Sequence, residues 1–203
     1  MVTPRKRPRQ QRSRETVAAI EEAAAQLFDR YGHAATTTNK IAERAGVSIG
    51  TLYRYFPNKD ALLWSLAEQH LDATAAAVTE ALARAARQEL PLPLLLHDIV
   101  HRVADLHTRR PALHRLLFDQ APRTPDLVAR FRQTEQALAA ALAAHLRRLG
   151  IAGSDPEAAA LLAVQGVQAQ IHGVVLDPPG GRDRDDLLAA IVTQWHRALT
   201  HHH

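Results

Sequence analysis

Hydrophobic residues recur every three or four positions along most of this chain, which is the period of an α-helix with one buried face. The first such stripe, within and just after residues 13–30, consists of Val17, Ile20, Ala24, Leu27, Phe28 and Tyr31. Ser13 is expected to cap this helix and Gly32 to end it. Further stripes follow between prolines, glycines and capping residues. The pattern therefore predicts an all-α chain of about nine helices.

Proline, glycine and Asp or Asn residues divide the rest of the pattern into separate helices. A fourth helix is expected over residues 59–88, with Asn58 as its cap. Breaks follow at Pro91, Pro93 and Pro111. Later helices are expected over residues 124–149 and 155–176, and a ninth helix after a cap at Asp183 or Asp185.

The stretch TTTNKIAERAGVSIGTLYRYFPNK, residues 36–59, combines two short helices with a tight turn. Thr37 and Ser48 are expected to cap the two helices, and Gly46 supplies the left-handed residue that ends the first. Leu52 lies on the buried side of the second helix. This arrangement is typical of a helix-turn-helix, in which the second helix offers its first turn to the major groove of DNA.

The segment IAERAGVSIGTLYRYFPNKDALL, with the preceding LFDRYG, closely resembles the tetracycline-repressor (TetR) family of bacterial transcription regulators. The resemblance covers roughly the first quarter to third of the chain, the usual span of such a domain. It implies a three-helix helix-turn-helix DNA-binding domain followed by a helical-bundle domain for ligand binding and dimerisation. We place these domains at residues 13–58 and 59–200, after a disordered basic arm at 1–12 and before a tag remnant at 201–203.

The resemblance also implies which residues contact DNA: Thr38, Asn39, Ser48, Ile49, Gly50, Thr51, Tyr53, Tyr55 and Lys59. Asn39 can form paired hydrogen bonds with an adenine edge, and Ile49 can pack on a thymine methyl group. Hydroxyl and ammonium groups such as those of Tyr53 and Lys59 suit phosphates, which position a protein without reading sequence. Each of these residues can alternatively be an ordinary exposed helix position.

Two positions depart from the pattern of the family. Many relatives carry an acid where Lys40 stands, which completes a capping box with the threonine. Lys40 therefore leaves that cap weaker or faces phosphate. Many relatives also carry Lys or Arg where Ile49 stands, so this apolar side chain predicts a different base preference.

Composition narrows the class of protein. The chain has 203 residues, of which 46% are hydrophobic and 4% aromatic, and this favours a soluble helical protein of one or two domains. It contains no cysteine, which excludes disulfides and thiolate metal sites and is compatible with the cytoplasm. Neither a signal peptide nor a membrane-spanning run is indicated, so we expect a cytoplasmic protein without a membrane partner. We expect no cofactor.

Positive charge is concentrated near the N-terminus. Residues 1–60 contain 11 Lys or Arg and 6 Asp or Glu, within a net charge of +4 for the whole chain. A basic N-terminal part is suited to binding phosphates, and a nearly neutral remainder is suited to a separate function. Basic residues of the arm, Arg5, Lys6, Arg7 and Arg9, can follow phosphates or enter a minor groove, or can form a solvated tail.

The helix expected over residues 59–88 is predicted to join the two domains. Its early leucines belong with the DNA-binding domain, whereas Val78 and Leu82 belong to a second core. Movement of its far end would therefore move the DNA-binding domain. This is a physical route by which a ligand can change the affinity for DNA.

The most enzyme-like motif comprises His97, Asp98 and His101, a cousin of the metal-binding pattern of metalloproteases. On a helical wheel these residues lie on the polar side, and an Asp is shorter than the Glu that the pattern requires. A solvated face is therefore expected here. His107 instead projects from the apolar arc and is either a hydrogen-bonded core residue or a pocket residue.

The helix expected over residues 155–176 has no ordinary polar face. One of its sides consists of small residues, which favours close approach of the same helix from a partner subunit. The expected dimer interface comprises Ala159, Ala163, Gly166, Ala169, Gly173, Leu188 and Trp195. A polar stripe on the same helix is either wet or part of a pocket. The expected ligand-binding residues are His107, Phe131, Leu161, Gln165, Gln168 and His172.

These patterns predict a homodimeric DNA-binding transcription regulator that binds a palindromic operator and responds to an unidentified small molecule. Family resemblance favours a repressor. Two other classes stay open: a helical metal-dependent hydrolase that uses His97 and His101, and a helical adaptor for another protein. The sequence has no G-x-S-x-G elbow and no phosphate-cradling glycine loop, so we expect it not to be an enzyme.

Overall fold

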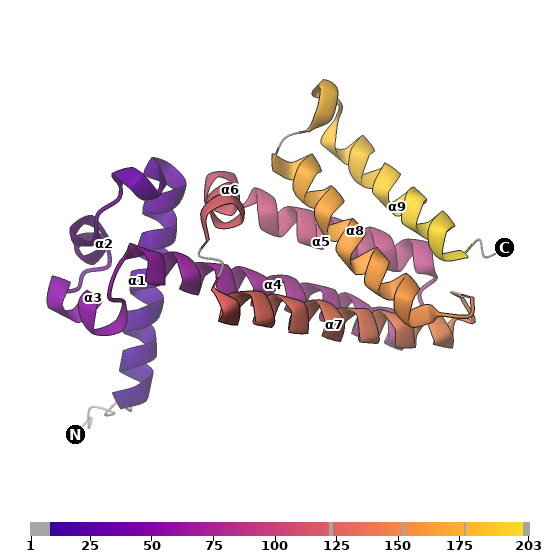
Figure 1. Ribbon diagram of the computed structural model, residues 1–203, viewed down its shortest axis with the longest axis horizontal. Helices are drawn as coiled ribbons and strands as arrows, with labels where there is room; N and C mark the ends of the chain where they lie inside the picture. Colours follow the sequence, from indigo (N-terminus) through magenta and orange to yellow (C-terminus); the bar gives the residue numbers. More distant parts are fainter. Residues whose placement is uncertain (1–8, 122–123, 152, 177, 201–203) are drawn as a thin grey trace, which may run out of the picture. The chain divides into compact units, whose positions relative to one another are not determined.

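The computed structural model describes residues 9–121, 124–151, 153–176 and 178–200. Within these ranges the elements are α1 Arg9–Ala35, α2 Thr38–Arg44, α3 Ile49–Tyr55, α4 Lys59–Gln88, α5 Leu92–Thr108, α6 Pro111–Gln120, α7 Pro125–Arg148, α8 Pro156–Leu176, a 3-10 turn at Pro179–Gly181, and α9 Arg184–Thr200 (Figure 1). The expected all-α fold of about nine helices is confirmed. Most of the expected basic arm and the expected tag remnant at 201–203 lie outside the described residues.

Capping side chains place most helix starts where the sequence predicts them. The amide N–H of Ala61 donates to Oδ1 of Asn58 at 2.8 Å, at the start of α4. Thr124 caps α7 in the same way. Of the two candidates for α9, Asp183 is the cap, because its Oδ1 accepts the amide N–H of Asp185 at 2.8 Å.

The start of α1 differs from the prediction. The helix begins at Arg9, so Ser13 lies inside it, and the Ser13 hydroxyl is 2.9 Å from the hydroxyl of Tyr55. The predicted cap at Ser13 was therefore wrong, since Arg and Gln in the preceding segment favour helix. Disorder of the basic arm stays a prediction. The predicted end is confirmed. Gly32 has φ 73° and ψ 171°, which interrupts the helix there.

The chain folds as two compact units, and α4 contributes to both. The first unit comprises the chain up to Glu68 together with most of α6, and the second comprises the remainder from Gln69. The domain boundary that we expect between residues 58 and 59 stays a prediction. By their contacts, the first turns of α4 and most of α6 belong with the first unit.

The first unit has one apolar core, built by α1, α2, α3, the start of α4 and α6. Phe28, Ile41 and Leu52 are almost completely buried in it. The amide N–H of Leu113 donates to Oδ1 of Asp29 at 2.9 Å, which ties α6 to α1. The short helices α2 and α3 are thus held by packing, because isolated helices of this length are unstable in water.

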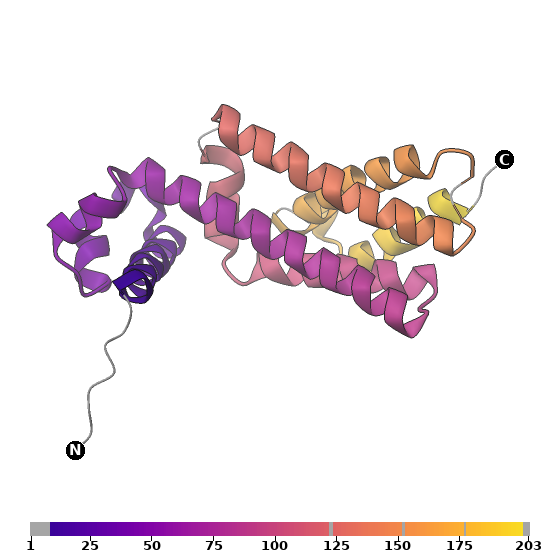
Figure 2. The ribbon, with the colours of Figure 1, turned by 90° about the horizontal axis from the view of Figure 1, so that it is seen from below.

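The second unit contains the rest of α4 with α5, α7, α8 and α9. α8 packs against α5, α7 and α9, and α5 also packs against α9 (Figures 1 and 2). Val100, Leu146, Ile171 and Leu188 are fully buried at its centre. Each such side chain contributes about 1.5–3 kcal/mol of transfer free energy.

Candidate functional site

Local hydrogen bonds build the helix-turn-helix as predicted. The amide N–H of Lys40 donates to Oγ1 of Thr37 at 3.2 Å, and the amide N–H of Thr51 donates to Oγ of Ser48 at 3.1 Å. Gly46, with φ 66°, turns the chain between the two helices. These caps satisfy amide groups at both helix starts and fix the direction of α3.

One face of α2 and α3 gathers polar and apolar side chains that are exposed or half-exposed in the described part of the first unit. The hydroxyl groups of Thr38 and Tyr53 lie 3.0 Å apart across the two helices. Tyr53 is 49% exposed and Ile49 is 38% exposed. Asn39 and Gly50 are also exposed. The structure therefore brings together most of the predicted DNA-contact residues on one surface.

Two predicted DNA contacts use their polar atoms within the chain. Nζ of Lys59 donates to the carbonyl oxygen of His33 at 2.6 Å. The ring of Tyr55 packs on the core, and its hydroxyl is bonded to Ser13 and Arg54. The Ser13 hydrogen bond is the main cause that lowers the pKa of Tyr55. Both residues hold α3 and α4 against α1.

Lys40 has a role that the sequence did not reveal. Its Nζ donates to the carbonyl oxygen of Ala35 at 3.3 Å, at the end of α1. This bond provides a partner for a carbonyl oxygen in the short segment that follows Gly32. Lys40 thus stabilises the end of α1 instead of completing a capping box.

The second unit contains an apolar cavity between α4, α5, α7 and α8, with a volume of about 50 Å³. Its lining residues are Thr74, Val78, Leu82, Leu96, Ile99, Val100, Val103, Leu138, Leu142, Ala163, Val164, Val167, Gln168 and Ile171. Thr74 and Gln168 are the polar members. A concave apolar site with few polar groups is typical of a small-molecule pocket.

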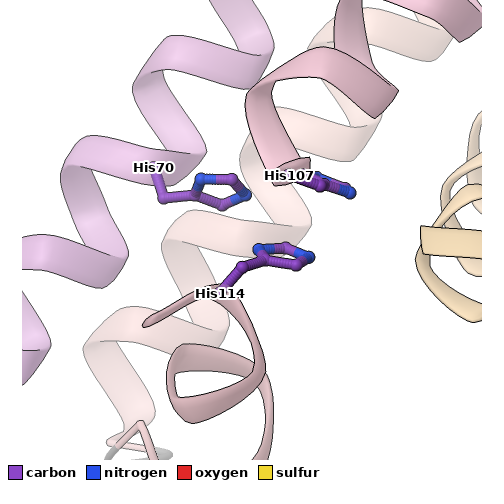
Figure 3. Close-up of side chains that lie close together, drawn as sticks. All are labelled: His70, His107 and His114. Atoms are coloured by element: carbon purple, nitrogen blue, oxygen red, sulfur yellow. The ribbon is translucent and has the colours of Figure 1, made fainter. Parts of the chain in front are cut away.

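Three histidines lie one helical turn beyond the lining residues, on three different helices. Figure 3 shows the side chains of His70 of α4 and His107 of α5, whose ring centroids are 5.0 Å apart. The ring of His172 of α8, which Figure 3 does not draw, has its centroid 6.0 Å from that of His107. His107 is only 2% exposed. Burial, and more weakly the neighbouring His172, lower the pKa of His70 to about 4. His70 is therefore neutral at pH 7.

The predicted ligand-binding residues divide into two groups. Gln168 lines the cavity, and His107 and His172 lie one turn from it. The other three do not line it: Leu161 packs on the core, Gln165 is exposed, and Phe131 is 37% exposed.

Sequence reasoning missed Thr74 and His70. Both lie on α4 at the helical spacing that leads to Val78 and Leu82, and this spacing could have identified them.

The face that carries His97 and His101 is a charged surface. The two rings stack with centroids 4.1 Å apart. The carboxylate of Asp98 pairs with the guanidinium groups of Arg84 and Arg102. A carboxylate held by two arginines is a poor general base, so the hydrolase alternative has no base in the position that its motif needs.

The outer face of α8 differs from the predicted dimer interface. Leu188 and Ala163, which we expected to meet a partner, are instead buried in the core of their own unit. Ala169 and Gly173 are exposed, and Ala159 is half-buried. The exposed stripe of α8, which we call the α8 stripe, comprises Ala158, Leu162, Gln165, Ala169 and Gly173.

α8 is also apolar enough and long enough to cross a membrane, judged by composition and length alone. Its 21 residues include a window of mean hydropathy 1.4. The expectation that no segment has these properties was wrong, because its polar residues are mostly uncharged glutamines. The core helix of a soluble protein passes the same test, but only 28% of this window is buried within the chain. The exposed remainder is a surface that lacks a cover.

Gly166 is needed where α9 crosses α8. A methyl group at this position would overlap Cζ2 of Trp195 and lie 2.9 Å from its Cη2. Nε1 of Trp195 donates to Oε1 of Gln170 at 2.7 Å, which fixes the indole. Trp195, our predicted interface anchor, therefore packs on its own subunit.

Gly166→Ala is expected to destabilise the protein. The overlap with Trp195 costs about 1–3 kcal/mol, and the gain in helix propensity offsets at most about 1 kcal/mol of it. Urea unfolding at fixed protein concentration measures the difference. In a Trp195→Leu background the same substitution should become neutral or stabilising; an unchanged cost there would show that the indole is not the cause.

Two family models match this chain. Residues 20–66 match bacterial regulatory proteins of the tetR family, and residues 91–199 match a tetracyclin repressor-like C-terminal domain. The transcriptional regulator YvkB of Bacillus subtilis is 47% identical over 57 residues, which cover 28% of this chain and 30% of YvkB. The chain therefore matches less than a third of the length of that relative.

Other similarities cover nearly the whole chain. The transcriptional regulator TtgR of Pseudomonas putida is 34% identical over 202 residues, covering 90% of this chain and 89% of TtgR. A TetR family transcription regulator from Marinobacter aquaeolei VT8 has the same fold, with a TM-score of 0.66, 22% identity, and coverage of 95% of this chain and all of the other. The exposed helix-turn-helix, the C-terminal model that spans more than half of the chain and the match to TtgR agree: the chain is a DNA-binding transcriptional regulator that belongs to the tetR family.

Proposed function

We propose that this regulator is a ligand-responsive repressor that binds a palindromic operator as a homodimer. The continuity of α4 carries the proposal. Its first turns pack in the core of the DNA-binding unit through Leu62 and Leu63, and its later turns line the cavity through Thr74, Val78 and Leu82. One continuous helix thus contributes residues to both the core of the DNA-binding unit and the lining of the cavity.

A ligand can change the affinity for DNA through this helix only if it binds one arrangement of the protein more tightly than another. The cavity is small, so a ligand larger than its free volume has to separate α4 from α5, α7 or α8. The arrangement with the helices separated binds the ligand more tightly. In that arrangement the two DNA-binding units of a dimer need not match the spacing of the two operator half-sites. Ligand binding then lowers the affinity for DNA by the ratio of its affinities for the two arrangements.

The homodimer is supported by the α8 stripe. Leu162 is 61% exposed, and the small residues Ala158, Ala169 and Gly173 lie on the same face. A self-complementary patch of this kind suits a two-fold symmetric interface, in which the same helix meets its copy. A two-fold dimer places two copies of α3 on DNA, which is why a palindrome is expected.

The proposal is tested by a mobility-shift and footprinting experiment on DNA that flanks the gene for this chain. We expect a protected palindrome and release of the DNA by the correct effector. A protein that ignores this DNA and genomic fragments at modest ionic strength, even after co-purified small molecules are removed, contradicts it.

Two substitutions separate positioning from base reading. Tyr53→Ala should weaken binding to all sequences about equally, because its hydroxyl suits a phosphate. Asn39→Ala should relax discrimination at one base pair, by about 1–3 kcal/mol. Affinities measured for the operator and for its single-base variants distinguish the two. Identical profiles for both variants would refute these assignments.

A further inference from the structure

The three histidines near the cavity share a position relative to it. His70 precedes Thr74 by one turn of α4, His107 follows Val103 by one turn of α5, and His172 follows Gln168 by one turn of α8. Because residues four apart lie on the same face of a helix, each histidine extends a lining stripe. The ring distances of 5.0 Å and 6.0 Å show that the three extensions meet at one end of the cavity. We call this group the imidazole cluster.

The cluster and the cavity are chemically different. Aliphatic side chains line almost all of the cavity, and the hydroxyl of Thr74 is already bonded to the carbonyl oxygen of His70 at 2.9 Å. Besides Thr74, Gln168 is the polar side chain among the lining residues. A molecule that fills this site therefore meets apolar surface along its body and imidazole nitrogens at one end.

The site is best matched by an organic acid. A buried carboxylate is costly unless it is paired, and its two oxygens accept hydrogen bonds from more than one donor. Each imidazole offers one N–H when neutral and two when protonated, and only histidine gains its charge near neutral pH. Three imidazoles from three helices can therefore supply both the hydrogen bonds and the positive charge that a carboxylate requires.

Resting on the function proposed above, we propose that the effector is a small monocarboxylic acid whose alkyl chain occupies the cavity and whose carboxylate contacts His70, His107 and His172. The cavity volume of about 50 Å³ sets its size. One water-sized group needs about 10–15 Å³, so the present cavity accepts a chain of roughly three to five carbons. A longer chain has to part the helices around it.

Binding of the acid is coupled to uptake of a proton. Burial and the nearby His172 keep His70 neutral at pH 7, with a pKa of about 4. A carboxylate beside it raises that pKa and lets the cluster take up a proton. Within the second unit, the groups that face His70 are His107 from α5 and His172 from α8, while Asp72 of α4 is paired at 2.7 Å with Arg130 of α7 on the exposed side.

Calorimetric titration of the full chain with butanoate, hexanoate, hexanol and methyl hexanoate tests the proposal. We expect hexanoate to bind at least about tenfold more tightly than the alcohol or the ester, since only the acid can pair with a protonated cluster. Each methylene that the cavity accepts should strengthen binding about fourfold. Titrations at pH 7 in two buffers of different ionisation enthalpy should show uptake of about one proton.

Variants locate the contact. His107→Gln should weaken hexanoate binding at least tenfold, whereas His97→Gln, on the exposed face of the same helix, should leave it unchanged. If His107→Gln fails to fold, the comparison of hexanoate with hexanol in the unchanged protein still tests the proposal. Equal affinity for hexanoate and hexanol, absence of proton uptake, or zinc binding that needs His107 without any binding of acids would overturn the proposal.

A mobility shift on the same preparation separates this inference from the proposed function. Protein that binds the operator but ignores every acid retains the regulator and loses the inference. Protein that binds hexanoate but no DNA retains the inference about the site and loses the proposed operator binding.

Discussion

Ile49→Glu is expected to weaken operator binding at least about 100-fold without loss of folding, because a like charge brought against a charged partner costs several kcal/mol. Ile49 is the first residue of α3 and is 38% exposed. The substitution removes an apolar contact with a base and places a carboxylate among phosphates. At the same time, an acid in the first turn favours the helix through its dipole. Fluorescence anisotropy with labelled operator, together with thermal unfolding, measures both effects.

Two control substitutions make this result specific. Val128→Glu puts the same charge in the first turn of α7, at an apolar residue that is 36% exposed in the second unit, and should leave the affinity for DNA unchanged. Ile49→Lys should retain or strengthen binding to non-specific DNA while it changes the base preference. If Ile49→Glu bound the operator as tightly as the unchanged chain does, the first turn of α3 would not face DNA.

Most of the first unit could be predicted because its determinants act over a few residues. Thr37, Gly46 and Ser48 fix the helix-turn-helix through bonds to amides three positions away or through a single left-handed residue. The place of α6 could not be predicted. It depends on the bond between Asp29 and Leu113, which are 84 residues apart, and no periodic pattern contains that information.

The candidate sites were predictable to different degrees for the same reason. A helical wheel places Gln168 and His172 on the same side of one helix, but it could not show which other helices face them. Phe131 was therefore included although it is outside the cavity lining, and His70 was missed although its ring lies 5.0 Å from that of His107. To predict a site built from several helices, one must know how those helices pack. A DNA-contact surface built from one short motif can be predicted without that knowledge.

Packing also decides which residues of α8 are free to meet a partner. The small residues of α8 predicted a close contact with a partner helix. Ala163 and Leu188 are instead buried in the core of their own unit, and Gly166 packs against Trp195. The surface that remains is the α8 stripe. Its most exposed large side chain, Leu162, is the position at which a single change should have the greatest effect on assembly.

Leu162→Arg is expected to convert the proposed dimer into a monomer. In a two-fold interface one substitution introduces two charges, one from each subunit, close to the symmetry axis. An unpaired buried charge costs about 3–5 kcal/mol, so the dimer should dissociate at least about 100-fold more readily. Light scattering over a range of concentrations measures the change. Leu94→Arg, at an equally apolar residue of α5 that is 55% exposed, is the matched control and should remain dimeric.

The same variant should lose operator binding although the DNA-contact surface is untouched. Two linked copies of α3 bind two half-sites with an avidity that can exceed the affinity of one copy by about 10²–10⁴. A monomer retains only the single-site affinity, so Leu162→Arg should still bind an isolated half-site as the unchanged chain does. Normal binding to the full palindrome by a monomeric Leu162→Arg would contradict the homodimer as the DNA-binding form. A dimeric Leu162→Arg would instead move the interface away from the α8 stripe and leave the exposed apolar face of α8 to another partner.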